Sequence, residues 1–217
     1  MTDTPRGDSA SKEKTIAMKV GLMIPAAAMA ALLGTPAWGL DTYKVDPAHS
    51  SIGFAIDHMV INTVHGRFRQ FDGTIGVDPA DANALKEAAA TIQAKSIDTD
   101  IAKRDDHLRS ADFFDVERFP TITFAGREVR NEGSDRVLVG KLTLHGVTKE
   151  ISLPFKLKGP IQAMGGTRLA LAANAKLNRK DYGLTWNKVL DTGGLMVGEE
   201  VTIQIDAEFV KETGKRK

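Results

Sequence analysis

The sequence contains no cysteine, and this absence excludes several chemistries at once. A chain without thiols has no disulfide framework, no zinc-thiolate or iron–sulfur site and no cysteine nucleophile. An excess of one charge is also lacking, because 29 Lys and Arg residues face 28 Asp and Glu residues, for a net charge of +1. Nucleic-acid-binding proteins usually carry a strongly basic surface, so we predict no nucleic-acid partner. The fold must be held together by its hydrophobic core.

Long hydrophobic runs are lacking too. Residues 20–33 carry no charge, but this stretch contains Pro25 and falls short of the roughly 20 apolar residues that a membrane-spanning helix needs. Three lysines precede it, and the small residues Ala37 and Gly39 follow it, as at a cleavage site. The order is typical of a secretory signal peptide; the alternatives are a short membrane anchor and a buried helix. We predict export to the periplasm with cleavage near Gly39.

The predicted cleavage defines the organisation of the chain. Residues 1–39 form the signal peptide, residues 40–211 one domain without linkers or repeats, and residues 212–217 a polar, frayed tail. Initiation at Met18 instead of Met1 would give a more compact signal peptide. Residues 1–39 carry one net positive charge, so their removal leaves a neutral mature protein.

Apolar and polar residues alternate along most of the mature chain from residue 50 onward. This period of two is typical of half-buried antiparallel strands, with one face toward the core and one toward water. Turn residues at 131–135 and at His145-Gly146 connect such segments as hairpins, and Gly159-Pro160 and Gly165-Gly166 bracket a further connection. About eight strands of this kind close most simply into an up-and-down barrel. Periodicity alone does not exclude a sandwich.

Two segments interrupt the alternation. Residues 81–90 are rich in alanine and begin with Asp81, a suitable N-cap, so they predict a short helix that leads into a strand over 91–96. Residues 100–114 predict a second helix, with Asp100 as its cap. The expected fold is therefore all-β: an antiparallel eight-stranded barrel with one or two short helices.

Residues 104–115 are the segment richest in chemically active side chains. His107 beside Asp105 or Asp106 could serve acid–base chemistry or bind a metal. Two ligands make a weak metal site, however, and no known metal-binding spacing is present. The favoured interpretation is structural: the charges cap, pair and face water, while Phe113 and Phe114 enter the core.

The other candidate motifs are weaker still. The remaining histidines, His49, His58, His65 and His145, occur singly in separate segments. Ser50 and Ser51 lack a nucleophile elbow, and Gly193-Gly194 lacks the lysine and helix of a phosphate loop. We therefore predict no catalytic residue, no metal site and no cofactor.

Residues 178–186 are unusual for their mixture of aromatic and basic side chains. Tyr182 and Trp186 combine an apolar ring with a polar atom, which suits the mouth of an apolar cavity. Arg179 and Lys180 could meet a phosphate or a ring oxygen there. A loop that simply closes one barrel end is an equally good interpretation.

Five segments of the mature chain resemble, in order, the YceI-like family of lipid- or polyisoprenoid-binding proteins. The most specific is RDDHLRSADFFDVERFPTITF, residues 104–124. The others are residues 64–68, 96–99, 144–149 and 178–184. The resemblance extends from Tyr43 to about Lys211. It implies a lipocalin-like barrel around an apolar tunnel that binds an isoprenoid chain, such as a polyprenyl phosphate or the tail of a respiratory quinone.

The resemblance and the strand pattern together give the expected binding residues. The apolar tunnel is predicted to be lined by Ile52, Phe54, Phe68, Phe113, Phe114, Ile122, Phe124, Leu142, Leu144, Trp186 and Ile203. The head group of the lipid is predicted to meet His107, Arg109, His145, Arg179 and Tyr182.

The predicted function is non-enzymatic binding, transport or sequestration of an isoprenoid lipid in the periplasm. The family is linked to stress responses and to cytochrome b561-type membrane proteins, and such a protein is an expected partner; a homodimer is also compatible with the sequence. Two alternatives stay open. One is an enzyme that uses His107 with Asp105 or Asp106 beside the pocket, and the other is a structural stress-response module whose barrel is packed solid.

Overall fold

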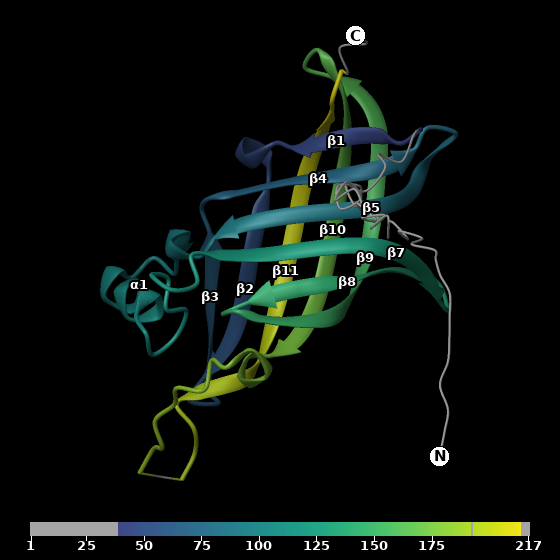
Figure 1. The fold of residues 1–217 in the computed structure, drawn as a ribbon. Helices are drawn as coiled ribbons and strands as arrows, with labels where there is room; N and C mark the ends of the chain where they lie inside the picture. Colours follow the sequence, from purple (N-terminus) through teal and green to yellow (C-terminus); the bar gives the residue numbers. More distant parts are fainter. Residues whose placement is uncertain (1–38, 192, 214–217) are drawn as a thin grey trace, which may run out of the picture. The chain divides into compact units, whose positions relative to one another are not determined.

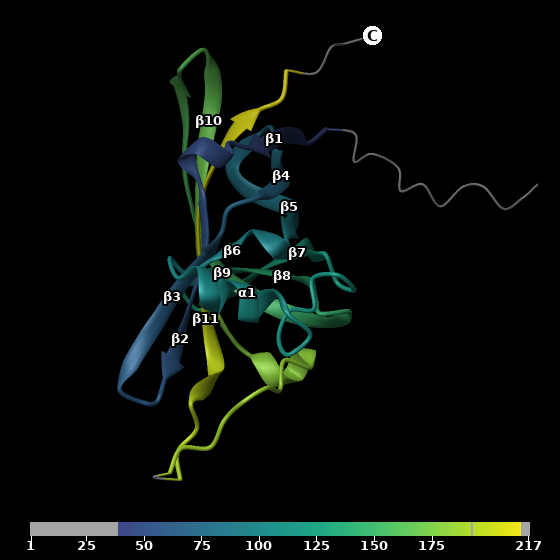
Figure 2. The same cartoon turned by 90° about the vertical axis from the view of Figure 1, so that its left-hand side faces the viewer.

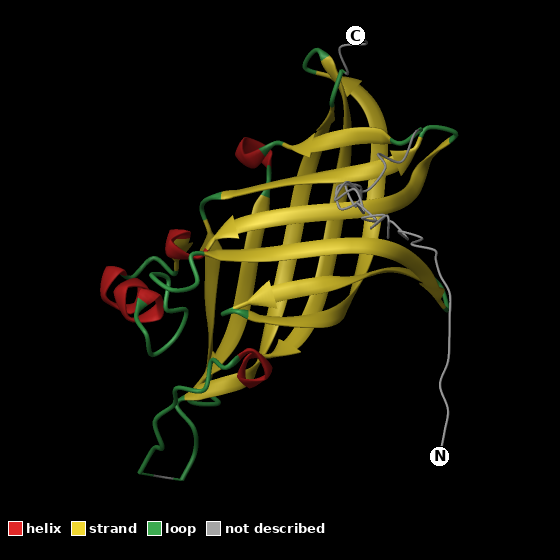
Figure 3. Cartoon of the chain, in the orientation of Figure 1, coloured by secondary structure: helices red, strands yellow, loops and turns green. Residues whose placement is uncertain are grey.

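Antiparallel strands make up most of the chain in the computed structural model, which describes residues 39–191 and 193–213 (Figures 1 and 3). The predicted signal peptide lies outside these residues except for Gly39, as do the last four residues of the predicted tail. The strands are β1 (Asp41–Val45), β2 (Ser51–His58), β3 (Asn62–Phe68), β4 (Phe71–Asp78), β5 (Asp81–Gln93), β6 (Ile97–Asp98), β7 (Thr121–Glu132), β8 (Asp135–Leu144), β9 (Val147–Ala163), β10 (Gly166–Asn178) and β11 (Val197–Lys211).

Eight of these strands close into a ring, which confirms the predicted barrel. The order is β1-β4-β5-β7-β8-β9-β10-β11, and β11 pairs back onto β1. Strands β4, β5, β7 and β8 cross over β10, β11 and β2, so that two walls face each other (Figure 1). The apolar face of each wall turns inward and builds two adjoining core clusters, one around Ile75 and Leu169 and the other around Ile97 and Tyr182.

The remaining three strands form an extension of the barrel wall. One edge of β11 pairs with β2 over residues 197–206 and with β1 over residues 209–211. Between β1 and β2 the chain forms the short 3-10 helix η1 (Pro47–His49). Ser50, which directly follows η1, accepts a hydrogen bond from the Glu208 N–H at 2.9 Å. Beyond this break β1 continues into the barrel, whereas β2 pairs with β3, and β3 with β6. The β2–β3 hairpin extends this wall beyond the barrel (Figure 2).

The hairpin turns follow the sequence signals at two of the three predicted places. His145 and Gly146, both with positive φ, join β8 to β9, and Gly133-Ser134 joins β7 to β8. The third turn is made by Met164 and Gly165 alone. Gly159-Pro160 lies inside β9 instead, opposite a register shift between Arg168 and Ala170 that marks a bulge.

The helix predicted over residues 81–90 is wrong: these residues belong to β5. Alanine favours helices in isolation, but tertiary pairing overrides this propensity here. Ala88, Ala89 and Ala90 pair with β4 on one side and with β7 on the other. The strand predicted over 91–96 also ends early, at Gln93, and residues 94–96 form the 3-10 helix η2 (Ala94–Ser96).

The second predicted helix is present but shorter. Helix α1 spans Ala102–Arg109, and its N-cap residue is Ile101, without a side-chain cap. The predicted cap, Asp100, precedes it with a positive φ and pairs instead with Arg67 at 3.2 Å. None of the helices in the described residues has the length and apolar character needed to cross a membrane.

Candidate apolar binding cavity

A cavity of about 350 Å³ lies between β2 and β3, the barrel wall and the α1 segment. It is lined almost wholly by hydrophobic side chains, and all eleven residues predicted for the tunnel are among them: Ile52, Phe54, Phe68, Phe113, Phe114, Ile122, Phe124, Leu142, Leu144, Trp186 and Ile203. They come from β2, β3, β7, β8, β11 and the loops that follow α1 and η3 (Arg179–Tyr182). The period-two pattern therefore brings the eight strand residues together, and the two loops add Phe113, Phe114 and Trp186 to the same space.

Several other lining residues were not predicted from the sequence. Ile151, Leu153, Leu177, Val201 and Ile205 also line the cavity, and they belong to the same alternating series, so the pattern could have supplied them. Ala90 also lines the cavity, and it was missed because its segment was predicted to be a helix.

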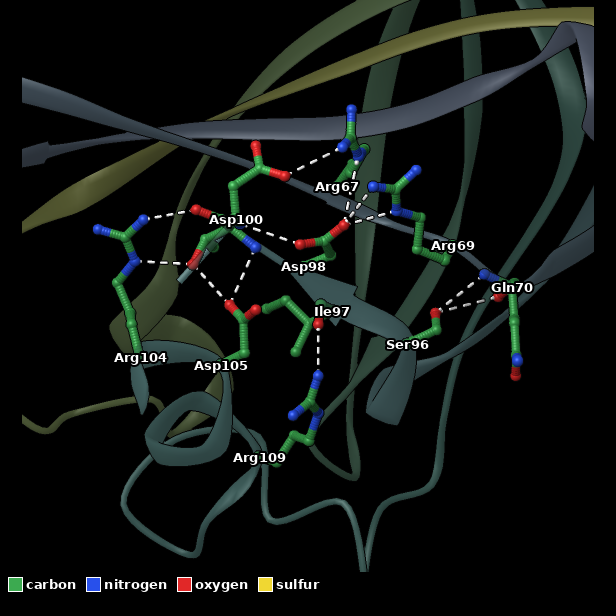
Figure 4. A network of polar contacts seen from close by, with 11 residues as sticks. Arg67, Arg69, Gln70, Ser96, Ile97, Asp98, Asp100, Arg104, Asp105 and Arg109 are labelled. Atoms are coloured by element: carbon green, nitrogen blue, oxygen red, sulfur yellow. Dashed lines mark hydrogen bonds and ion pairs between the residues drawn. The ribbon is translucent and has the colours of Figure 1, made fainter. Parts of the chain in front are cut away.

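Charged side chains fix α1 and the residues that follow it against the rest of the fold (Figure 4). The buried Asp105 carboxylate accepts hydrogen bonds from the N–H of Thr99 at 2.9 Å and from its hydroxyl at 2.5 Å. Arg104 donates to the Thr99 carbonyl at 2.7 Å. Arg109 donates to the carbonyls of Lys95 and Ile97, both at 2.9 Å. These bonds hold α1 beside β6 as one wall of the cavity.

His107 lines the cavity and packs edge-on against two neighbouring aromatic rings. Its ring centroid lies 5.0 Å from that of Phe113 and 5.0 Å from that of Trp186, and the Phe113 and Trp186 centroids are 5.1 Å apart. The Nε2 atom of His107 forms a hydrogen bond with Asp112 at 2.9 Å. The hydrogen-bond partner of His107 is therefore neither Asp105 nor Asp106, the two residues considered from sequence.

Arg179 is the most deeply buried cation on the cavity lining, with an exposed fraction of 4%. It donates to the carbonyls of Gly198 at 2.8 Å and Trp186 at 2.9 Å, and also to that of Leu184. Burial lowers the pKa of its guanidinium from the usual value. Arg179 thus ties the loop that carries Trp186 to the start of β11.

The other three predicted head-group residues lie outside the cavity lining. Arg109 faces the backbone of residues 95–97. His145 packs against Phe119 with a centroid distance of 4.5 Å and bonds to the Tyr182 carbonyl. Tyr182 is enclosed in the core, and burial raises the pKa of its phenol. These three side chains contact the segments around the cavity and do not face the cavity itself.

A second cluster, of Asp46, His49 and Glu208, has ligand atoms within 4.8 Å of one another. Arg168 contacts both carboxylates, with its Nη1 atom 2.9 Å from Asp46. A guanidinium already supplies positive charge at this point, so the cluster is an ion-pair network at the break between β1 and β2.

Comparison with known proteins gives a consistent result. The YceI-like domain family matches residues 43–209. The UPF0312 protein SAS2572 of Staphylococcus aureus is 37% identical over 172 residues, which cover 78% of this chain and 98% of that protein.

Two solved structures share the fold. The YCEI protein of Campylobacter jejuni superposes with a TM-score of 0.61 and 26% identity, over 72% of this chain and 90% of that one. A polyisoprenoid-binding domain from Saccharophagus degradans superposes with a TM-score of 0.57 and 18% identity, over 78% and 98% of the two chains. From the family match, the strand order and the shared barrel, we conclude that this chain belongs to the YceI-like family.

Proposed function

We propose that this protein binds an isoprenoid lipid in its apolar cavity and carries or sequesters it without making or breaking a bond. The observation that carries the proposal is the cavity of about 350 Å³, which is lined by hydrophobic side chains from both facing walls. A solidly packed structural module would leave no such space. The domain of Saccharophagus degradans that shares this fold is described as polyisoprenoid-binding, which supports the same ligand class here.

The physical chemistry of the cavity suits a long hydrocarbon chain. Each methylene group that leaves water contributes roughly 0.8 kcal/mol, so a prenyl tail needs few polar contacts to bind. The polar side chains on the lining include Asp57 and His58 of β2, Arg104 and His107 of α1, and also Thr99 and Arg179. A phosphate or quinone head group would be oriented there, since a few convergent polar groups are enough to fix a ligand's direction.

The remaining parts of the proposal concern location and partners. Export to the periplasm follows from the predicted signal peptide, and a cytochrome b561-type membrane protein, a homodimer and a role in stress responses stay predictions. Acid–base catalysis has less support, because Asp105 bonds to Thr99 and His107 bonds to Asp112.

The test is native mass spectrometry on the mature protein purified from the periplasm, followed by organic extraction. We expect a stoichiometric adduct with the mass of a prenyl lipid, a polyprenyl phosphate or a quinone. A clean apo mass that stays unchanged after incubation with ubiquinone and undecaprenyl phosphate would contradict the proposal.

A matched pair of variants on β11 locates the site. Ile203 lines the cavity. Gln204, the next residue on the same strand, is exposed and does not line the cavity. Ile203→Trp fills part of the cavity and should abolish the adduct. Gln204→Trp adds the same ring to the outer face and should leave the adduct unchanged. Equal adducts in both variants would place the lipid elsewhere.

A further inference from the structure

A second, smaller cavity of about 80 Å³ continues the first toward the β1 and β4 end of the barrel. On every strand that contributes to both cavities, the residues that line the first cavity lie toward one end and those that line the second lie toward the other end. On β9, for example, Ile151 lines only the first, Leu153 lines both, and Phe155 lines only the second. The two spaces therefore lie one behind the other along the barrel interior.

Five residues line both cavities, one from each of five strands: Ile52, Ala90, Phe124, Leu153 and Ile205. They form a girdle between the two spaces. Phe124 has the largest side chain of the five, and it packs against both core clusters. Removing the ring of Phe124 would open the girdle more than truncating any other member.

The position of the Phe124 ring is fixed by two glycines that face each other across β7 and β8. Gly126 pairs directly with Gly140. A Cβ atom at Gly140 would lie 2.6 Å from the ring Cζ atom, and one at Gly126 would lie 2.9 Å from its Cε1 atom. Only glycine leaves room for the ring in this place, because real Cβ atoms do not approach carbon so closely.

We infer that Phe124 is a partition that sets the length of tail the protein accepts. The inference rests on the proposed function: an isoprenoid tail enters the larger cavity, and its end stops at the Phe124 ring. Affinity should then rise with each isoprene unit until the larger cavity is filled, and level off afterwards. Without the ring, the smaller cavity becomes available to further units.

The experiment measures dissociation constants for prenyl alcohols that differ only in length, namely geraniol, farnesol, geranylgeraniol and solanesol. We expect Phe124→Ala to move the plateau to a longer alcohol. Its affinity for that alcohol should exceed that of the wild type by about tenfold or more, since two further buried methylene groups contribute roughly this factor.

Two further variants make the test specific. Phe54 lines only the larger cavity, so Phe54→Ala widens that space without opening the girdle and should move the plateau less than Phe124→Ala does. Ala88 lines only the smaller cavity, so Ala88→Leu added to Phe124→Ala should reverse the gain. Circular dichroism verifies folding, and Phe124→Leu, which also removes the ring, replaces Phe124→Ala if the latter does not fold.

The outcomes separate the two proposals. An unchanged plateau in Phe124→Ala, or an equal gain in Phe54→Ala, overturns the partition and leaves lipid binding intact. Absence of binding of every alcohol to the wild type overturns the proposed function and the partition with it.

Discussion

Arg168 joins two carboxylates at the point where β1 and β2 part along β11. Its guanidinium bonds to Asp46 and to Glu208, and Asp46 also accepts from the Ala48 N–H and bonds to His49 Nδ1 at 2.9 Å. The hydrogen bonds from His49 and then Arg168 lower the pKa of Asp46 from 3.8 to about 2. A charged Asp46 is therefore part of the folded state at this break in the strand.

This pKa predicts a dependence of stability on acid. Asp46 stays ionised in the folded protein down to about pH 2, whereas the unfolded chain takes up the proton near pH 3.8. A depressed folded-state pKa contributes stability that is present above the unfolded pKa and is lost as the pH falls toward the folded one. We expect the thermal midpoint to fall between pH 4 and pH 2, and to fall less in Asp46→Asn.

The control is Asp135→Asn, at an exposed position at the start of β8. Calorimetric scans across this pH range should show Asp135→Asn following the wild type. If Asp46→Asn loses as much stability as the wild type over the same range, the assignment to Asp46 is wrong.

At the scale of the element, α1 shows how a short polar helix can serve as one wall of an apolar cavity. Its charged side chains reach back to the backbone of residues 95–99, and the phenylalanines that follow the helix face the cavity. An eight-residue helix has little stability of its own in water. Its place is therefore set by these contacts.

Two neighbouring aspartates of α1 provide a matched test of this docking. Asp105 is buried on Thr99, whereas Asp106 is exposed and pairs with Arg109. Asp105→Ala should lower the free energy of unfolding by about 2 kcal/mol, because the buried Thr99 donors lose their acceptor. Asp106→Ala should change it by less than about 0.5 kcal/mol. Urea denaturation measures both values, and equal losses would argue against the docking role of Asp105.

At the scale of the whole molecule, the barrel contains unfilled apolar space. Side chains that face a cavity lose the dispersion contacts that close packing provides. A ligand that fills this space binds the folded state and not the unfolded chain, so it should stabilise the protein by linkage.

The prediction is that delipidated protein melts earlier than the protein saturated with a prenyl ligand. At a free ligand concentration a hundred times Kd, the stabilisation should be about 2.7 kcal/mol. Differential scanning calorimetry with added geranylgeraniol measures the shift. Ile203→Trp, whose cavity is partly filled, should show little shift; a shift as large as that of the wild type would mean that the alcohol acts at another place.

Much of this architecture could be predicted from the sequence, because a period of two specifies both the strand and its inward face. The tunnel residues Ile122 and Leu142 line the cavity for that reason. The pattern fails at Ala88–Ala90, where alanine carries no alternation in polarity and its helix propensity is opposed only by pairing with β4 and β7. Local sequence does not contain that information.

Predicting the polar contacts was harder than predicting the apolar lining. Arg179 and His107 line the cavity, but Arg109, His145 and Tyr182 do not. A long polar side chain in a turn can face either way, and its direction depends on which carbonyls the fold leaves unpaired nearby. The girdle around Phe124 was equally out of reach, since it depends on residues from five different strands.

The closure of the ring by β1 and β11 has a consequence for the order of folding. Residues 43–45 pair with residues 209–211, and Lys211 bonds to Asp41, a partner 170 positions away. Among the described strands these are the first and the last. The barrel cannot close while the chain is still emerging from the ribosome, and contacts of such long range form slowly. A nascent chain therefore stays open along this seam until its final strand arrives.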